Sequence, residues 1–94
     1  MKEKIQQKLT KHFTILCNGN KVKILNYKLK QEQDGKLVLQ LITKIPNILL
    51  SQKNICLEIS DEKQPMQLYC TWLCELSAPN VKRYYYEVHN TKEL

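Results

Sequence analysis

The chain has 94 residues and a formal net charge of +6, with 43% hydrophobic and 26% charged residues. This length and composition indicate one globular domain, residues 1–94, and exclude a disordered or low-complexity chain. No apolar run approaches the roughly 20 residues that cross a bilayer, and residues 1–13 lack the apolar segment of a signal peptide. We therefore expect a cytoplasmic protein with no membrane partner, whose four cysteines are reduced thiols.

A short predicted helix precedes a predicted β-hairpin at the start of the chain. Residues 2–11 place two apolar side chains one helical turn apart, which favours a short amphipathic helix. From residue 12 onward the apolar residues recur with a period of two. The dipeptide Asn18-Gly19 readily adopts positive φ at both positions of a tight turn. Residues 12–17 and 20–29 on either side of it are therefore predicted to be the two strands of a hairpin.

Four more strands are predicted at residues 36–45, 55–60, 66–76 and 81–89, followed by a polar tail at 90–94. Apolar and polar residues alternate along each of them, which is typical of half-buried antiparallel strands. The alternation groups the following side chains on one face of their strands: Leu37, Leu39 and Leu41; Ile55, Leu57 and Ile59; Met66, Leu68, Cys70, Trp72, Cys74 and Leu76; Tyr84, Tyr86 and Val88. Six closely spaced strands over residues 12–89 predict a mainly β fold, a small antiparallel six-stranded barrel or sandwich with a short N-terminal helix.

The pair Cys70 and Cys74 raises the question of a metal or redox site. Four residues along a straight strand separate two side chains by ~13 Å. Zinc requires its sulfur ligands around one ion, each at about 2.3 Å. The spacing therefore predicts no shared metal, and the cysteines are interpreted as small buried hydrophobic residues.

Other catalytic motifs are equally absent from the sequence. His12 and His89 lie at opposite ends of the chain, and neither has a cysteine nearby in sequence that it could activate. The single glycines, Gly19 and Gly35, stand in turns and do not form a phosphate-binding loop. We therefore predict a protein that is not an enzyme, with no catalytic residues, no cofactor and no metal.

A candidate binding surface is predicted from basic and aromatic residues. On the last strand Arg83 and Tyr85 share one face, while Lys82 shares the opposite face with two tyrosines. An exposed Tyr beside an Arg can anchor a protein interface or stack a nucleobase. The alternative is that the tyrosines are present because tyrosine favours β-strands, with the ring packed on the sheet and the hydroxyl in contact with water. The predicted binding surface consists of Lys21, Lys23, Lys82, Arg83 and Tyr85.

From Lys21 onward, the stretches KVKILNYKLKQEQDGKLVLQL, IPNILLSQKNICLEI, MQLYCTWLCEL and KRYYYEVHN resemble in order and spacing the PilZ family of small six-stranded barrels. That family binds cyclic di-GMP through an R-x-x-x-R element and a [DN]-x-S-x-x-G motif. Here residues 26–31 read NYKLKQ, without the serine and glycine, and no arginine pair precedes them. The resemblance therefore implies a degenerate member acting as a protein adaptor, and cyclic di-GMP is not expected as a ligand.

A weaker resemblance competes with the first. The stretch LVLQLITKIPNILLSQKNICLEIS is similar to the core of CS-type co-chaperone sandwiches, which would require another strand after the final NTKEL.

The sequence thus predicts a non-catalytic binding module: a protein-interaction adaptor, an assembly subunit or an inhibitor. The alternative is a small basic β-barrel that binds nucleic acid through the same residues. Fourteen of the fifteen cations are lysine, and Arg83 is the only arginine. Specific readers of phosphate or bases usually depend on arginine, so this composition favours another protein as the partner. The small size and the tyrosines are compatible with a homodimer, although no motif specifies one.

Overall fold

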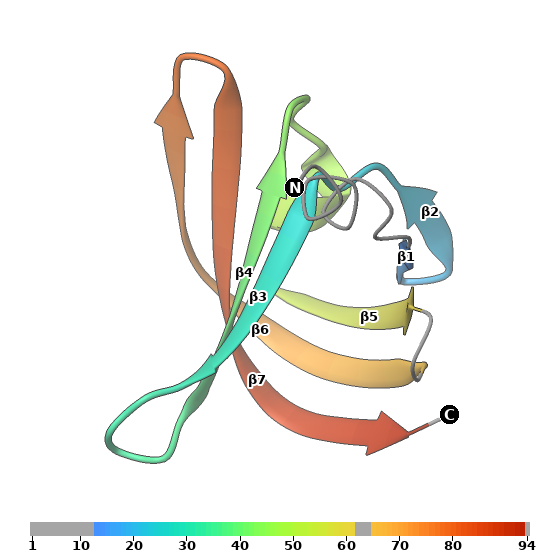
Figure 1. Cartoon of the computed structure of the whole chain (residues 1–94), viewed down its shortest axis with the longest axis vertical. Helices are drawn as coiled ribbons and strands as arrows, with labels where there is room; N and C mark the ends of the chain where they lie inside the picture. Colours follow the sequence, from blue (N-terminus) through green and yellow to red (C-terminus); the bar gives the residue numbers. More distant parts are fainter. Residues whose placement is uncertain (1–12, 62–64, 94) are drawn as a thin grey trace, which may run out of the picture.

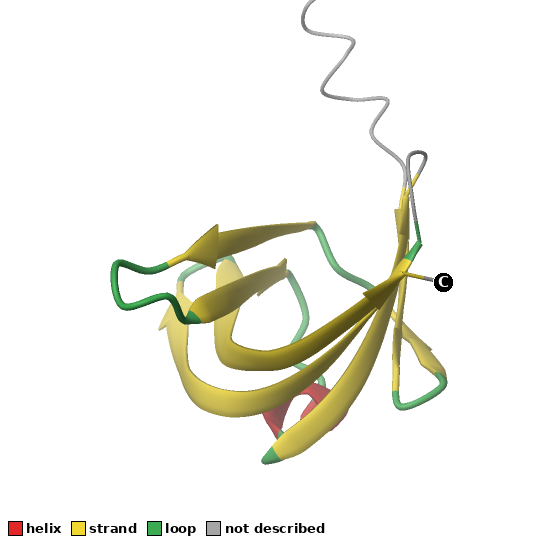
Figure 2. Ribbon diagram, turned by 90° about the horizontal axis from the view of Figure 1, so that it is seen from below, coloured by secondary structure: helices red, strands yellow, loops and turns green. Residues whose placement is uncertain are grey.

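Seven strands form one antiparallel sheet in the computed structural model, which describes residues 13–61 and 65–93. The elements are β1 (Phe13–Cys17), β2 (Asn20–Val22), β3 (Asn26–Gln31), β4 (Leu37–Thr43), the 3-10 turn η1 (Ile48–Ser51), β5 (Asn54–Asp61), β6 (Met66–Ala78) and β7 (Val81–Glu93). The strand order across the sheet is β2-β1-β5-β6-β7-β4-β3. The sheet curls strongly, so that its inner face surrounds the core and its outer face points to solvent (Figures 1 and 2).

The structure confirms the mainly antiparallel β class, but the predicted six-stranded barrel or sandwich is wrong. The sheet is open and has seven strands, because residues 20–29 do not form one return strand. They divide into β2, where Val22 lies opposite Ile15 of β1, and β3, where Asn26 lies opposite Ile42 of β4. β2 and β3 therefore occupy opposite edges of the sheet, and no backbone ladder joins them. The predicted helix at residues 2–11 lies outside the described residues.

The edge strand β3 nevertheless approaches the start of β1, which β2 does not cover, through side chains. The rings of Phe13 in β1 and Tyr27 in β3 meet edge to face, with centroids 5.1 Å apart. This T-shaped arrangement is one that aromatic pairs prefer, because the positive edge of one ring meets the negative face of the other. We call the line where β3 approaches β1 the seam of the sheet.

The β1–β2 hairpin confirms the turn that was predicted from the sequence. Asn18 and Gly19 both have positive φ, 52° and 87° respectively. The Asn18 side chain also accepts a hydrogen bond of 2.9 Å from the backbone N–H of Cys56. This bond ties the turn to β5, so the asparagine serves both the turn geometry and the sheet.

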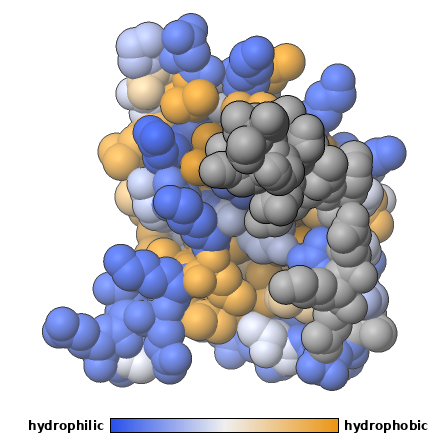
Figure 3. Space-filling view, in the orientation of Figure 1, coloured by the Kyte–Doolittle hydropathy of each residue, from blue (hydrophilic) through white to orange (hydrophobic). Residues whose placement is uncertain are grey.

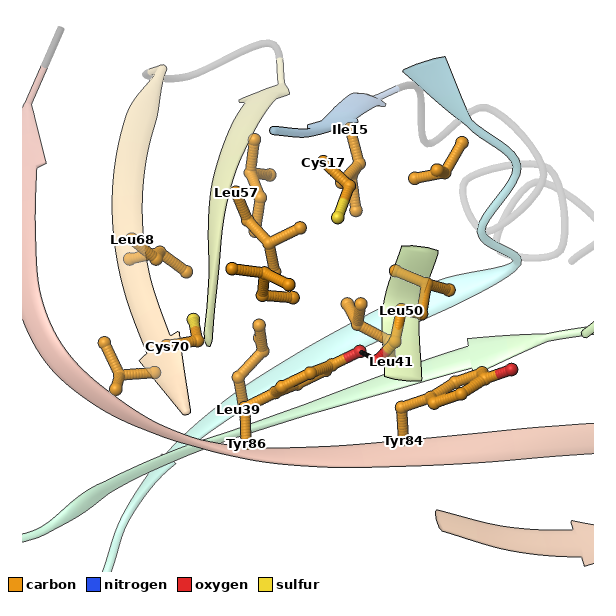
Figure 4. Close-up of a cluster of buried hydrophobic side chains, with 14 residues drawn as sticks. Ile15, Cys17, Leu39, Leu41, Leu50, Leu57, Leu68, Cys70, Tyr84 and Tyr86 are labelled. Carbon is orange, nitrogen blue, oxygen red and sulfur yellow. Dashed lines mark hydrogen bonds between the residues drawn. The ribbon is translucent and has the colours of Figure 1, made fainter. Parts of the chain in front are cut away.

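The core lies on the inner face of the curled sheet (Figure 4). It confirms the inward faces that were predicted for β4, β5 and β7, since Leu39, Leu41, Leu57, Tyr84 and Tyr86 are at most 1% exposed. Leu50 of η1 is also fully buried. Its carbonyl accepts a 2.6 Å hydrogen bond from the Tyr86 hydroxyl, which fixes η1 against the inner face.

A β-bulge divides β6, one of the two 13-residue strands, into two parts whose side chains alternate in opposite phase. Trp72 lies opposite the buried Tyr86, whereas Cys74 lies opposite Tyr85, and Leu73 between them has no partner. An extra residue on one strand inverts the alternation beyond it. The prediction that Cys74 and Leu76 face inward with the first half of β6 is therefore wrong.

The hairpin between β6 and β7 extends past the end of β5 as an arm, which we define as residues 73–78 and 81–85 and whose β7 half still pairs with β4 (Figure 1). β5 accompanies β6 only as far as Thr71, so the arm has no neighbour on the β6 side within the described strands. At the other end, residues 90–93 continue β7 and pair with β6, where Glu93 lies opposite Met66. These residues are polar and exposed, but the strand does not end at residue 89 as predicted, because residues 90–93 extend β7 and pair with the start of β6.

Candidate functional site

The structure separates the five predicted binding residues into three places. Lys82 lies on the inner side of the arm, where its ammonium group forms a 2.8 Å ion pair with Glu75 and lies 5.6 Å from the centre of the Tyr84 ring. The hydrogen bond from Lys82 is the main reason that the pKa of Glu75 is lowered. Lys82 therefore stabilises the arm locally and is not part of a surface with Arg83 and Tyr85.

Arg83 and Tyr85 lie together on the outer face of the sheet, as the alternation predicts. In the cross-strand register, Arg83 stands between Ile42 of β4 and Leu76 of β6. Tyr85 stands in the next row, between Gln40 and Cys74. Lys28 of β3 extends that row, because it lies opposite Gln40. We call these residues the outer patch: Lys28, Gln40, Ile42, Cys74, Leu76, Arg83 and Tyr85.

The outer patch combines apolar surface with unpaired positive charge. Leu76 is 55% exposed, and Figure 3 shows hydrophobic residues reaching the surface on the arm. Lys28 and Arg83 form no ion pair with any residue that the structure describes. A groove of about 580 Å³ runs beside Tyr85 and is lined by Lys28 and Lys30.

Acidic residues lie close to these lysines. Glu32 lines the same groove as Lys28 and Lys30. Glu87 lies on β7 opposite Val38, which in turn lies opposite Lys30. The positive surface is therefore interrupted, which disfavours a continuous track for a phosphate backbone.

Lys21 and Lys23 lie at the seam, away from the outer patch. They line a cleft of about 430 Å³ together with Lys44, which follows β4. We call this the seam cleft, and its lining residues are Phe13, Thr14, Ile15, Lys21, Val22, Lys23, Ile24, Leu25, Lys44 and Ile45.

The cysteines occupy different environments, and all four are free thiols. Cys17 and Cys70 are buried in the core, whereas Cys74 is exposed on the outer patch. Burial, together with the nearby thiols of Cys56 and Cys17, raises the pKa of Cys70 to about 12. Burial likewise raises the pKa of Cys17. Both buried thiols are therefore protonated at neutral pH and poorly nucleophilic.

The bulge places Cys70 and Cys74 on opposite faces of β6, so these two sulfurs do not converge on one site. Over residues 13–61 and 65–93, no group of three or more His, Cys, Asp or Glu side chains is arranged to hold a metal ion.

Sequence reasoning missed several residues of both sites. Ile42 was visible as an apolar residue on the outer face of its strand, but its role depends on the neighbouring arm. Leu76 was predicted to face inward, because the bulge at Leu73 leaves no mark in the alternation. Leu25 and Lys44 were missed at the seam cleft, since their proximity follows from the break between β2 and β3.

Comparisons with known proteins give no family for this chain: no family model, no curated protein and no solved structure matches it significantly. The resemblances to PilZ barrels and to CS-type sandwiches therefore stay predictions. Among the described residues, none belongs to a helix with the length and apolar character needed to span a bilayer.

Proposed function

We propose that the protein is a non-catalytic protein-interaction module and that the outer patch is its binding face. The observation that carries this proposal is the composition of a solvent-facing sheet surface. An antiparallel sheet face in water normally carries polar residues. Here Ile42, Leu76 and Tyr85 surround Arg83 in adjacent cross-strand rows.

The residue types at the outer patch are those that dominate protein interfaces. Tyrosine and arginine are enriched among the residues that contribute most to binding, particularly where neighbouring apolar side chains exclude water from them. Tyr85 and Arg83 are both half-buried within the sheet surface. They are therefore partly ordered before binding, which reduces the entropic cost of forming an interface.

Nucleic acid is the second candidate partner, favoured by the groove in which Lys28 and Lys30 flank Tyr85. A base could stack on the tyrosine while the lysines neutralise phosphates. Glu32 and Glu87 beside these lysines weaken this reading, as does the predominance of lysine over arginine. We therefore rank it second.

The test is a pull-down from native lysate with tagged protein, with and without nuclease and at two salt concentrations. Three chains are compared: the wild type, Arg83→Ala/Tyr85→Ala, and the control Lys53→Ala/Tyr69→Ala. The control removes one cation and one tyrosine outside the outer patch. We expect the wild type and the control to retain protein partners after nuclease treatment and at high salt. We expect the patch variant to lose them.

Two further measurements make the result decisive. Circular dichroism melting checks that the double variant is folded. Leu76→Asp repeats the test at a 55%-exposed position on which the core does not depend. Equal recovery of every partner by the wild type and both patch variants would contradict the proposal. Retention that nuclease or high salt abolishes would instead favour nucleic acid.

A further inference from the structure

The seam cleft is a preformed concave site with an apolar interior. Ile15 and Val22 are buried beneath it, at 1% and 7% exposure. Leu25 and Ile45 also line it, yet they are 52% and 68% exposed. The cleft thus has a buried apolar floor, and its apolar walls are exposed to solvent. Its volume of about 430 Å³ falls within the range of ligand pockets.

The cleft exists because the sheet is left open at this point. β2 pairs with β1 only over Ile15–Cys17, and the chain then leaves the sheet at Lys23. Phe13 and Thr14 therefore pair with β5 on one side and have no β2 residue opposite them on the other. An occupant of the cleft would lie along a strand edge that the described ladders leave unfilled.

The charged residues that line the cleft all have the same sign. Lys21, Lys23 and Lys44 line it from two separate segments of the chain, and all three are exposed. None of its ten lining residues is acidic. A ligand that fills this cleft therefore gains from apolar groups at its centre and negative charge at its flanks.

We propose that the seam cleft binds a segment of a partner protein in which one or two bulky apolar side chains are flanked by carboxylates. The apolar side chains enter between Leu25 and Ile45, and the carboxylates meet the lysines. Charge argues against two other occupants. Residues 1–12 carry four lysines and one glutamate, and a second copy of the chain carries a net charge of +6. Neither sequence therefore supplies the net negative charge that the lysines of the cleft attract.

This site is distinct from the outer patch, because the two share no residue. The inference therefore does not depend on the proposed function. It adds a second docking site that selects partners by acidic charge.

The test uses a fluorescein-labelled peptide of nine residues, with a central Leu-Phe-Leu flanked on each side by three glutamates. Fluorescence anisotropy measures its affinity for the full chain, and two-dimensional amide NMR maps the residues that respond. We expect saturable binding, with shifts over Phe13–Ile15, Lys21–Leu25 and Lys44–Ile45. A peptide with its glutamates replaced by lysines, and one with its centre replaced by Ser-Gly-Ser, should both bind at least about tenfold more weakly.

Variants at exposed positions separate the two parts of the site. Leu25→Ser/Ile45→Ser removes the apolar walls, and Lys23→Glu/Lys44→Glu reverses the charge; each should weaken binding about tenfold or more. The matched controls are Ile48→Ser, at an 82%-exposed position outside the cleft, and Lys53→Glu. These controls, and Leu76→Asp on the outer patch, should leave the affinity within about twofold of the wild type.

Three results would overturn the inference. The first is no binding of the acidic peptide to the wild type. The second is binding that depends on charge alone and is unaffected by Leu25→Ser/Ile45→Ser. The third is that phosphatidylserine vesicles bind through Leu25 and Ile45 while the peptide does not, which would assign the cleft to a lipid surface.

Discussion

The hydroxyl of Tyr27, at the start of β3, donates a hydrogen bond of 2.9 Å to the carboxylate of Asp61, at the end of β5. β3 is one edge of the sheet, and β5 lies third from the other edge. The bond therefore crosses the seam, where no backbone ladder operates. Together with the contact between Tyr27 and Phe13, it holds β3 against the β1–β5 side of the open, curled sheet.

Tyr27→Phe should lower the free energy of unfolding by about 1 kcal/mol, because it removes a hydrogen bond to a charged acceptor but keeps the ring against Phe13. Urea denaturation measures the change. Tyr69→Phe is the control, since it removes an exposed hydroxyl that bonds to Gln67 and should change the free energy by less than about 0.5 kcal/mol. Equal effects in the two variants would show that the seam bond does not contribute.

The seam should also weaken at alkaline pH. Burial, and then the hydrogen bond and the negative charge of Asp61, raise the pKa of Tyr27 to about 12. An unfolded tyrosine ionises near pH 10. The stability linked to this group is therefore complete below about pH 10 and is lost as the pH rises toward 12.

The measurement is the free energy of unfolding of the wild type and of Tyr27→Phe between pH 8 and pH 12. The free energy of unfolding of the wild type should exceed that of Tyr27→Phe by less and less between about pH 10 and pH 12, because only the wild type can ionise at this position. The other alkaline groups are common to both chains and cancel in the comparison. A constant difference across this range would mean that Tyr27 ionises equally easily in both states.

Tyr86→Phe should be more damaging than Tyr84→Phe. The Tyr86 hydroxyl donates to the carbonyl of Leu50, and both residues are fully buried. Removing a buried partner costs about 1–3 kcal/mol. The Tyr84 hydroxyl instead accepts a longer bond, 3.2 Å, from the backbone N–H of Asn47, which is only partly buried. Thermal unfolding of the two variants compares them, and the reverse order would contradict the role of Tyr86 in holding η1.

Thr43→Val should stabilise the protein by up to about 1 kcal/mol. Thr43 is fully buried at the end of β4, and its hydroxyl oxygen has no hydrogen-bond partner in the described structure. A buried polar group without a hydrogen-bond partner lowers stability. Valine has nearly the same shape as threonine but carries a methyl group in place of the hydroxyl. Thr43→Ala serves as the comparison, because it also removes a methyl group and should destabilise. A loss of stability in Thr43→Val, measured by urea denaturation, would show that the hydroxyl is hydrogen-bonded in solution.

Alkylation should distinguish the cysteines by position. Cys74 is exposed, whereas Cys17 and Cys70 are buried and have raised pKa values. Iodoacetamide at pH 8 should therefore modify Cys74 first in the native protein and reach Cys17 and Cys70 only after denaturation. Peptide mass mapping over time measures the order. Modification of Cys70 as fast as Cys74 would contradict the packing of β6 against the core.

Much of the inner face was predictable from the sequence because alternation is a local property. The buried leucines of β4 and the tyrosines of β7 follow directly from a period of two. The Asn18-Gly19 turn was predictable for the same reason, since its geometry depends on two adjacent residues. These features require no knowledge of which strands are neighbours.

The rest depends on pairing between distant segments. Residues 20–29 alternate like one strand, and nothing local indicates that Val22 pairs with β1 while Asn26 pairs with β4. The bulge at Leu73 is likewise a property of the β6–β7 ladder. Both candidate sites depend on these two irregularities, which is why the sequence placed Arg83 and Tyr85 on one face but did not separate Lys21, Lys23 and Lys82 from them.

The bulge at Leu73 means that the register between β6 and β7, as well as residue identity, decides what the outer patch displays. If Leu73 paired with Tyr85 instead of bulging, every later residue of β6 would move by one position. Glu75 would then lie opposite Arg83, and Leu76 would turn to the inner side opposite Lys82. The same side chains would remain, but a carboxylate would replace the apolar neighbour of Arg83. Deleting Leu73 would not have this effect, because Cys74, Glu75 and Leu76 would keep their present partners. A slip of one position in a single ladder could therefore exchange an apolar binding face for a charged one without any change of sequence.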